Sequence, residues 1–191
     1  DGDPWRDQAF GELLVLRVWR CPDDPWPREQ IDSLPASEGA VRRGVVFMIV
    51  RLLRDGHEFD EAMVWLERLA QFEDELISSA LHGAVWKFRD QRPCVSGGRL
   101  LGILARTPFH LRYSPSFNLL HVLEQYLADY PVLVTDVCEK LLEITRGHTG
   151  DPRELLRLIL AIEARDDQAE AGLRMFERAC DLELYGTHEL L

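Results

Sequence analysis

The sequence predicts an all-α protein built from helix hairpins. Apolar residues recur at three- and four-residue steps over most of the chain, which is the period of a helix with one buried face. No stretch shows the strict alternation of apolar and polar residues that a half-buried strand would have. Most connections between the helical segments are short and contain proline or glycine, so consecutive helices should pack as antiparallel pairs.

The first expected helix spans residues 4–19, because Pro4 suits the first turn of a helix. We expect its buried face to consist of Phe10, Leu13, Leu14, Leu16, Val18 and Trp19. Residues 20–35 are rich in proline and predict a loop with a short turn at 29–33. The triplet Asp-Pro-Trp occurs at 3–5 and 24–26, and we interpret the second copy as a turn whose tryptophan packs onto the body.

A long central helix is expected next, capped by Ser37 and ending at about Arg54 before Gly56. The segment VVFMIV at 45–50 is apolar on all sides, which is typical of a helix with neighbours all round.

Three further helices are expected at 58–70, 72–90 and 98–106. The acidic run at 73–75 favours a helix N-terminus rather than a pair of catalytic acids. The third helix should stop before Pro108, since a residue that precedes proline avoids helical angles.

The clearest hairpin lies at residues 117–144, where Pro131 separates two amphipathic runs of similar length. After Gly147 and Gly150, the sequence Asp-Pro-Arg-Glu at 151–154 predicts the start of another helix. A last full helix is expected at 167–182, with an inner face formed by Leu173, Phe176, Ala179, Cys180 and Leu182.

Helix pairs of this kind pack either as a stack of repeats or as a globular helical bundle. The short segments WLERL, EKLLE and MFERA recur weakly along the chain. Their spacing of roughly 35 to 45 residues suits HEAT-like arrays. We therefore favour a single HEAT-like α-solenoid domain over residues 1–191, with the globular bundle as the alternative.

The composition of the chain argues against several classes of function. The chain of 191 residues is 46% hydrophobic, which suffices for a core, and its net charge of −11 argues against extensive wrapping of nucleic acid. No run of eighteen apolar residues occurs, so no membrane span is expected. The cysteines are scattered without a CxxC pair, which predicts reduced thiols rather than a zinc site. We expect a cytoplasmic protein.

Motifs of catalysis are missing from the sequence. It contains no GxxxxGK[ST], GxSxG or HExxH, and the six histidines are dispersed. We therefore expect a non-enzymatic protein without a cofactor or metal. An enzyme whose site residues are dispersed along the chain is one alternative, because convergent sites need not leave a local pattern.

One basic stretch stands out in this acidic chain. Residues 87–112 contain a single acid, Asp90, together with the candidate binding residues Lys87, Arg89, Arg92, Arg99, Arg106 and Arg112. Ser96-Gly97-Gly98 lies near an expected helix start, where free backbone N–H groups favour anions. This stretch suggests a basic patch that binds an acidic partner, nucleic acid or a nucleotide phosphate. The opposing interpretation is that these arginines pair with the acids of residues 58–75.

The C-terminal sequence DPRELLRLILAIEARDDQAEAGLRMFERACDLELYGTHELL resembles the final HEAT-like helices of large bacterial STAND (NLR-like) NTPases. The resemblance covers residues 151–191 and rests on a helix followed by the Leu184-Tyr185-Gly186 turn and a new helix. It implies the sensor or scaffold part of an antiphage-defence assembly. It does not imply ATPase activity, because the chain has no P-loop.

Together these features predict a protein-interaction, sensor or scaffold module of a larger bacterial assembly. The chain opens on Asp1 and ends in LYGTHELL, which is typical of the start of a further helix. We therefore expect a piece of a longer protein.

Overall fold

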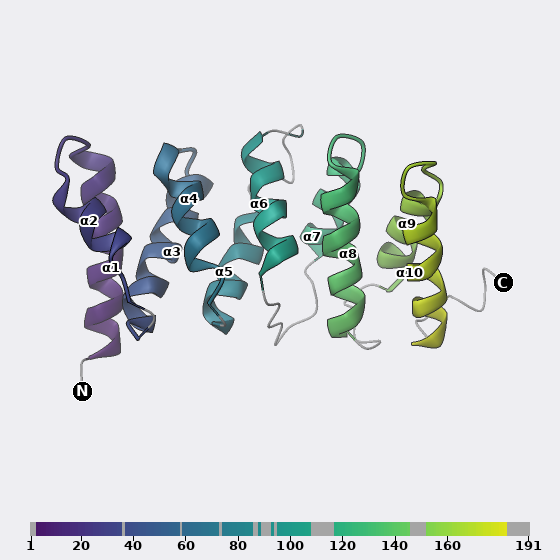
Figure 1. Ribbon diagram of the computed structural model, residues 1–191, viewed down its shortest axis with the longest axis horizontal. Coiled ribbons are helices and arrows are strands. Elements are labelled where there is room, and N and C mark those ends of the chain that lie inside the picture. The colour runs from purple at the N-terminus through teal and green to yellow at the C-terminus, as the bar shows by residue number, and fades with distance from the viewer. Residues whose placement is uncertain are drawn as a thin grey trace.

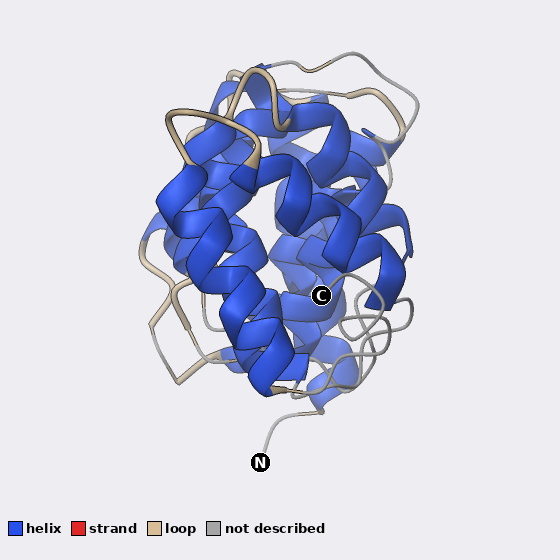
Figure 2. Ribbon diagram, turned by 90° about the vertical axis from the view of Figure 1, so that its right-hand side faces the viewer, coloured by secondary structure: helices blue, strands red, loops and turns tan. Residues whose placement is uncertain are grey.

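The computed structural model describes residues 3–35, 37–57, 59–72, 74–85, 88, 93, 95–107, 117–145 and 152–182. Within these ranges the regular secondary structure is helical, and no strand occurs (Figure 2). The helices are α1 (Pro4–Arg20), α2 (Trp26–Asp32), α3 (Gly39–Arg54), α4 (Asp60–Leu69), α5 (Glu75–Val85), α6 (Val95–Arg106), α7 (Phe117–Tyr126), α8 (Pro131–Thr145), α9 (Pro152–Glu163) and α10 (Ala169–Asp181). The prediction of an all-α fold is confirmed.

The helices follow one another along the long axis of the molecule in chain order (Figure 1). The odd-numbered helices contact one another in sequence, from α1 to α9, and form one layer. In the second layer α4 contacts α6, α6 contacts α8, and α8 contacts α10. Each helix therefore packs mainly against helices that are close to it in chain order.

The first junction of the odd-numbered layer is a close backbone contact between α1 and α3. Gly11 of α1 lies against the backbone of Val41 and Val45, and Gly44 of α3 lies against the backbone of Gln8 and Glu12. A Cβ atom at either glycine would overlap main-chain atoms of the other helix. Glycine is required here because it lets the two helix backbones approach closely.

Helix α2 corrects the prediction of a loop over residues 20–35. Proline is tolerated in the first turn of a helix, and Pro27 lies there. Asp24 accepts a hydrogen bond from the backbone N–H of Trp26 at 3.1 Å, and Asp3 does the same for Trp5 at the start of α1. Both Asp-Pro-Trp triplets thus begin helices. Trp26 is exposed beneath the guanidinium of Arg17 rather than packed into the core.

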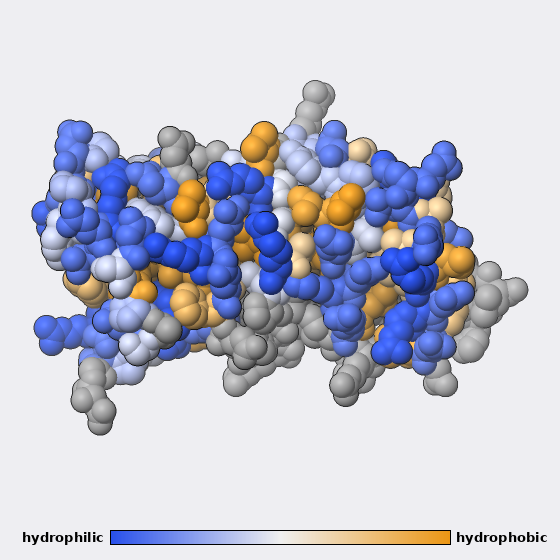
Figure 3. Space-filling view, viewed as in Figure 1, coloured by the Kyte–Doolittle hydropathy of each residue, from blue (hydrophilic) through white to orange (hydrophobic). Residues whose placement is uncertain are grey.

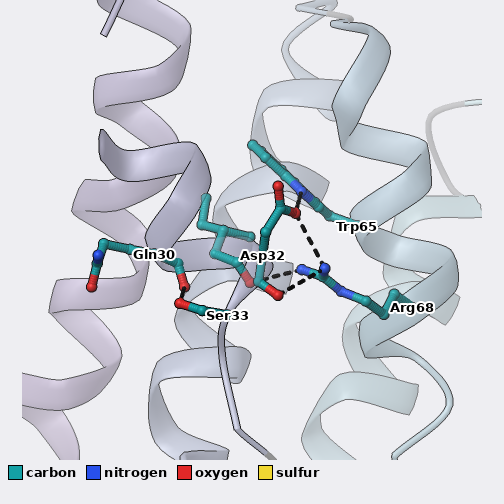
Figure 4. A network of polar contacts seen from close by, with 6 residues as sticks. Gln30, Asp32, Ser33, Trp65 and Arg68 are labelled. Atoms are coloured by element: carbon teal, nitrogen blue, oxygen red, sulfur yellow. Dashed lines mark hydrogen bonds and ion pairs between the residues drawn. The ribbon is translucent and has the colours of Figure 1, made fainter. Parts of the chain in front are cut away.

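Side chains of α4 hold the C-terminal end of α2 (Figure 4). The indole Nε1 of Trp65 donates to the carboxylate of Asp32 at 2.9 Å, and Arg68 donates to the same carboxylate at 3.1 Å. Arg68 also donates to the backbone carbonyl of Ile31 at 2.7 Å. A cation beside the last carbonyls of a helix stabilises its C-terminus, so α4 stabilises the short α2.

Several predicted boundaries move by a few residues. Helix α3 begins at Gly39 with Glu38 in the capping position, so Ser37 is not its cap. Helix α5 begins at Glu75, because Asp74 accepts hydrogen bonds from the N–H groups of Leu76 and Ile77. The predicted break at Gly56 is confirmed, and its φ of 87° is one that glycine adopts readily.

The predicted hairpin at 117–144 is confirmed as α7 and α8, with Pro131 as the first residue of α8. Its apolar stripes are buried, including Leu120, Leu123, Val134 and Leu141. Burial in α8 raises the pKa of the Cys138 thiol to about 12, so this cysteine is a core residue and not a reactive one. The expected cap at Asp151 lies outside the described residues, and α9 begins with Pro152.

The predicted inner faces of the first and last helices are only partly correct. In α1, Leu14 and Val18 are buried, whereas Phe10, Leu13 and Trp19 are exposed. In α10, Ala179 is buried, whereas Leu173 is exposed. Within the described residues no helix combines the length and the apolar character needed to cross a membrane.

Candidate functional site

Charged contacts between hairpins join several of the even-numbered helices, namely α2 with α4, α4 with α6 and α8 with α10. In Figure 3 the face formed by these helices is largely hydrophilic, with small hydrophobic areas between the charged side chains. The region of interest is the junction between α4 and α6, because it contains two of the arginines predicted from the sequence as binding residues. We call it the α4/α6 groove and define it by Glu67, Gln71, Arg99, Ile103, Arg106, Thr107 and Lys140.

Arg99 and Arg106 lie on the same side of α6 and face α4. Their guanidinium nitrogens are each 3.7 Å from the same carboxylate oxygen of Glu67. The Arg106 side chain is 70% exposed and that of Glu67 36% exposed, so water screens this contact. The sequence left open whether these arginines bind a ligand or pair with acids of residues 58–75. Arg99 and Arg106 both pair with one of those acids, Glu67.

A shallow cavity of about 210 Å³ opens beside this ion pair. It is lined by Glu67, Gln71, Ile103, Arg106 and Thr107, so an apolar side chain lies between charged and amide groups. This mixture suits the side chain of a polypeptide, which offers both hydrogen-bonding groups and apolar carbon.

Lys140 of α8 extends the positive charge of the groove. Its ammonium donates to the backbone carbonyl of Thr107 at 2.9 Å, immediately after the end of α6. Burial lowers the pKa of Lys140, while the nearby carboxylates of Glu143 and Asp136 act in the opposite direction. The lysine thereby links α8 to α6. Its positive charge lies at the C-terminal end of α6, where backbone carbonyl groups favour cations.

The other predicted binding residues, Lys87, Arg89, Arg92 and Arg112, lie outside the described residues. Gly97 and Gly98 are inside α6, which begins at Val95, and both are buried. Gly97 lies against the phenol of Tyr126. A Cβ atom added to Gly98 would lie 2.5 Å from the ring of Tyr130. These glycines make room for two stacked tyrosine rings whose centroids are 5.7 Å apart.

A second cavity of about 340 Å³ lies between α8 and α10. It is lined by Glu139, Leu142, Glu143, Arg174, Met175 and Arg178. Arg174 lies across it, 3.5 Å from Glu139 of α8 and 3.3 Å from Glu170 of its own helix. Apolar and charged side chains together therefore line the cavities at two junctions of this layer.

Polar contacts between successive hairpins join residues that are 31 to 39 positions apart, from the pair Arg43 and Asp74 to the pair Glu67 and Arg106. The partners Arg28 and Glu61 are 33 positions apart, as are Asp32 and Trp65. Thr107 and Lys140 are also 33 positions apart. Sequence analysis missed these partners, although charged residues that recur at a separation of about one repeat would have been a usable signal.

Among the residues that the structure describes, no three histidine, cysteine, aspartate or glutamate side chains gather as a metal site would require. His121 and Gln125 of α7 lie within 3.1 Å of each other through their side-chain nitrogens.

Compared with models of protein families, with curated proteins and with solved structures, the chain matches none of them.

Proposed function

We propose that this protein is a HEAT-like α-solenoid that binds another protein through its even-numbered helices. The observation that supports this most is the set of polar contacts between successive hairpins, which join residues 31 to 39 positions apart along the chain. Stacks of this kind present long continuous surfaces without needing catalytic residues. The order of the helices along the molecule agrees with such a stack (Figure 1).

The α4/α6 groove is the proposed binding site, and its occupant is an acidic peptide segment of the partner. Arg99 and Arg106 share one carboxylate, that of Glu67, so the pair of arginines has positive charge in excess. Exposed ion pairs contribute only about 0–1 kcal/mol, so a partner carboxylate replaces Glu67 at little cost. A guanidinium also binds carboxylates through two parallel hydrogen bonds, which adds direction to the contact.

The test uses display of acidic peptides against the full chain, followed by titration of a selected peptide. The charge swap Arg99→Glu with Arg106→Glu should weaken binding by about tenfold or more, because attraction becomes repulsion. The matched control is Arg51→Glu with Arg157→Glu, which changes the net charge equally on exposed residues of other helices. An unchanged affinity in the first variant, or an equal loss in the control, would contradict the groove as binding site.

The same titration separates the alternative functions. Tighter binding of an oligonucleotide or inorganic phosphate than of any acidic peptide, with an affinity that falls steeply with salt, would favour a nucleic-acid or phosphate-ligand site. Turnover of a panel of nucleotides would favour an enzyme with dispersed residues.

We further propose, on the resemblance of residues 151–191, that the module serves as the sensor or scaffold part of a STAND-type assembly in a bacterial cytoplasm. Sequencing of the reading frame upstream of Asp1 tests this proposal. A P-loop in that region would support it, and a start codon directly before Asp1 would contradict it.

A further inference from the structure

The α4/α6 groove contains an anion position that the chain itself satisfies only in part. The guanidinium nitrogens of Arg99 and Arg106 approach the same carboxylate oxygen of Glu67, each at a distance of 3.7 Å. The two nitrogens therefore lie no more than twice that distance apart, and both reach the place that the Glu67 carboxylate occupies.

The contacts with Glu67 are too long to be hydrogen bonds, which join nitrogen and oxygen at about 2.7–3.2 Å. Within the described residues neither guanidinium donates a hydrogen bond to any other group. Their donors face water, because the Arg99 side chain is 40% exposed and that of Arg106 is 70% exposed. The arginine pair thus keeps unused N–H donors as well as an excess of positive charge.

Neighbouring groups add to this position. Gln71 is exposed and lines the same cavity as Glu67 and Arg106, so its amide N–H groups can donate to a ligand there. Lys140 adds a cation at Thr107, another residue of the lining, although Asp136 and Glu143 of α8 lie near that lysine. Among the described residues that line the cavity, Glu67 is the one acid.

A carboxylate from a partner gains little over Glu67 at this position. The exchange leaves the charge and the number of acceptor oxygens unchanged, and Glu67 is already held beside the arginines by α4. A phosphomonoester carries a charge of about −1.5 to −2 at neutral pH and has three strong acceptor oxygens. It therefore matches the charge of both arginines and accepts more of their forked hydrogen bonds than a carboxylate does.

We infer that the α4/α6 groove selects a phosphorylated peptide segment, whose phosphoserine or phosphothreonine places its phosphate between Arg99 and Arg106 in the position of the Glu67 carboxylate. The inference rests on the proposed function, because it names the chemistry of the peptide that the groove binds. Glu67 acts as an internal competitor, and its partly exposed side chain turns toward solvent when the phosphate binds. Phosphorylation of the partner thereby controls its binding.

A single phosphate on a peptide suits this chain better than a nucleic acid does. A nucleic acid presents many phosphates to a large surface, and the net charge of −11 repels such a polyanion. One phosphate needs only the local cluster of Arg99 and Arg106.

The test compares peptides that differ at one position. The full chain is titrated, by fluorescence polarisation, with labelled peptides from a library whose central residue is phosphoserine, aspartate or serine. For the sequence that binds best, the phosphoserine form should bind about tenfold or more tightly than the aspartate form, and the serine form should bind least. Inorganic phosphate and a single-stranded oligonucleotide should displace it only at higher concentrations than the unlabelled phosphoserine peptide does.

Two variants assign the effect to the groove. Arg99→Gln with Arg106→Gln should remove the preference for phosphoserine over aspartate, because both converging cations are lost. Glu67→Gln should strengthen the binding of both forms by up to about fivefold, since an exposed ion pair is a weak competitor. Glu61→Gln is the matched control, because it makes the same change on the same helix at a residue that pairs with Arg28 instead.

Equal affinities of the phosphoserine and aspartate forms would overturn the inference and leave the acidic-peptide site intact. Weaker binding by Glu67→Gln, with Glu61→Gln unchanged, would overturn the role of Glu67 as a competitor. Displacement by inorganic phosphate or the oligonucleotide at the same concentration as by the peptide would overturn the choice of a peptide. If no form of any peptide binds, the proposed function fails together with the inference.

Discussion

The junction between α1 and α3 and the junction between α4 and α6 are held together in opposite ways. At the first, Gly11 and Gly44 bring two helix backbones into direct contact, and Val15, Val18 and Val45 are buried around them. At the second, charged side chains bridge the helices, and a cavity of about 210 Å³ remains beside them.

The two junctions differ in how much they contribute to stability and in how accessible their polar groups are. A close backbone contact excludes any change in side-chain size, and it contributes through dispersion and apolar burial. A charged and partly open junction contributes little to stability, but it offers groups that another molecule can bind. The two junctions thus differ in kind, because one fixes two helix backbones against each other and the other leaves charged groups exposed.

The largest expected effect is that of Gly44→Val on the first junction. The added side chain would overlap the backbone of Gln8, so we expect the free energy of unfolding to fall by about 3 kcal/mol or more, at the upper end of the range for overpacking. Chemical denaturation followed by circular dichroism measures this loss.

Gly39→Ala is its matched control on the same helix. An added Cβ there meets only the end of the Arg42 side chain at 3.6 Å, so stability should stay level or rise slightly. Equal losses in the two variants would show that the backbone contact does not distinguish the two positions.

An intermediate effect is expected at the clamp between α2 and α4. Asp32→Ala removes the acceptor for both Trp65 and Arg68, and should lower the free energy of unfolding by about 1–3 kcal/mol, because the buried indole N–H loses its partner. Trp65→Phe removes the N–H donor together with part of the buried ring, and leaves Arg68 bonded to Asp32. A greater loss for Trp65→Phe than for Asp32→Ala would indicate that packing of the indole, and not the hydrogen bond, holds α2.

A smaller effect is expected at the second junction. Arg106→Ala breaks the exposed contact with Glu67 and should change the free energy of unfolding by less than about 0.5 kcal/mol. Thermal melts of this variant beside Gly44→Val measure the contrast between the two junctions directly. A loss comparable to that of Gly44→Val would mean that the α4/α6 groove is part of the structural core.

The smallest effect is a pH dependence at the contact between α2 and α4. The hydrogen bond from Arg28, at 2.7 Å, holds the pKa of Glu61 below its ordinary value of 4.5. The stabilisation is therefore complete above that ordinary value and is lost as the pH falls through the lowered pKa. Because both side chains are partly exposed, the change should be only a few tenths of a kcal/mol.

Comparison of the wild type with Glu61→Gln across this acidic range isolates the contribution of Glu61. The stability difference should shrink as the pH falls below about 4.5. A difference that stays constant or grows at acidic pH would show that the ion pair is not its origin.

The clearest agreement between sequence and structure is the hairpin of α7 and α8. Its apolar period and Pro131 were enough to place both helices, because periodicity and proline act within a few residues. The loop predicted for residues 20–35 fails for a physical reason, since α2 has only 7 residues and depends on Trp65 and Arg68 for its C-terminal end. An isolated helix of that length is unstable in water, so its own sequence gives a weak signal.

Of the candidate binding residues, the sequence identified Arg99 and Arg106 by composition alone. It did not indicate that both face Glu67, which is contributed by another hairpin. Nor did it indicate that Gly97 and Gly98 pack against Tyr126 and Tyr130, since a glycine pair near a helix start is equally typical of an anion site.

The sequence by itself determined that this protein is helical, where most of its helices lie, and that Pro131 begins the second helix of a hairpin. These properties depend on periodicity, capping and proline, all of which act over one or two helical turns. Only the tertiary structure decided which glycines are close contacts, which charges meet across hairpins, and that Phe10, Leu13 and Leu173 are exposed. Those outcomes depend on contacts between residues about 30 positions apart or more, and a local pattern carries no information about which distant segment will cover it.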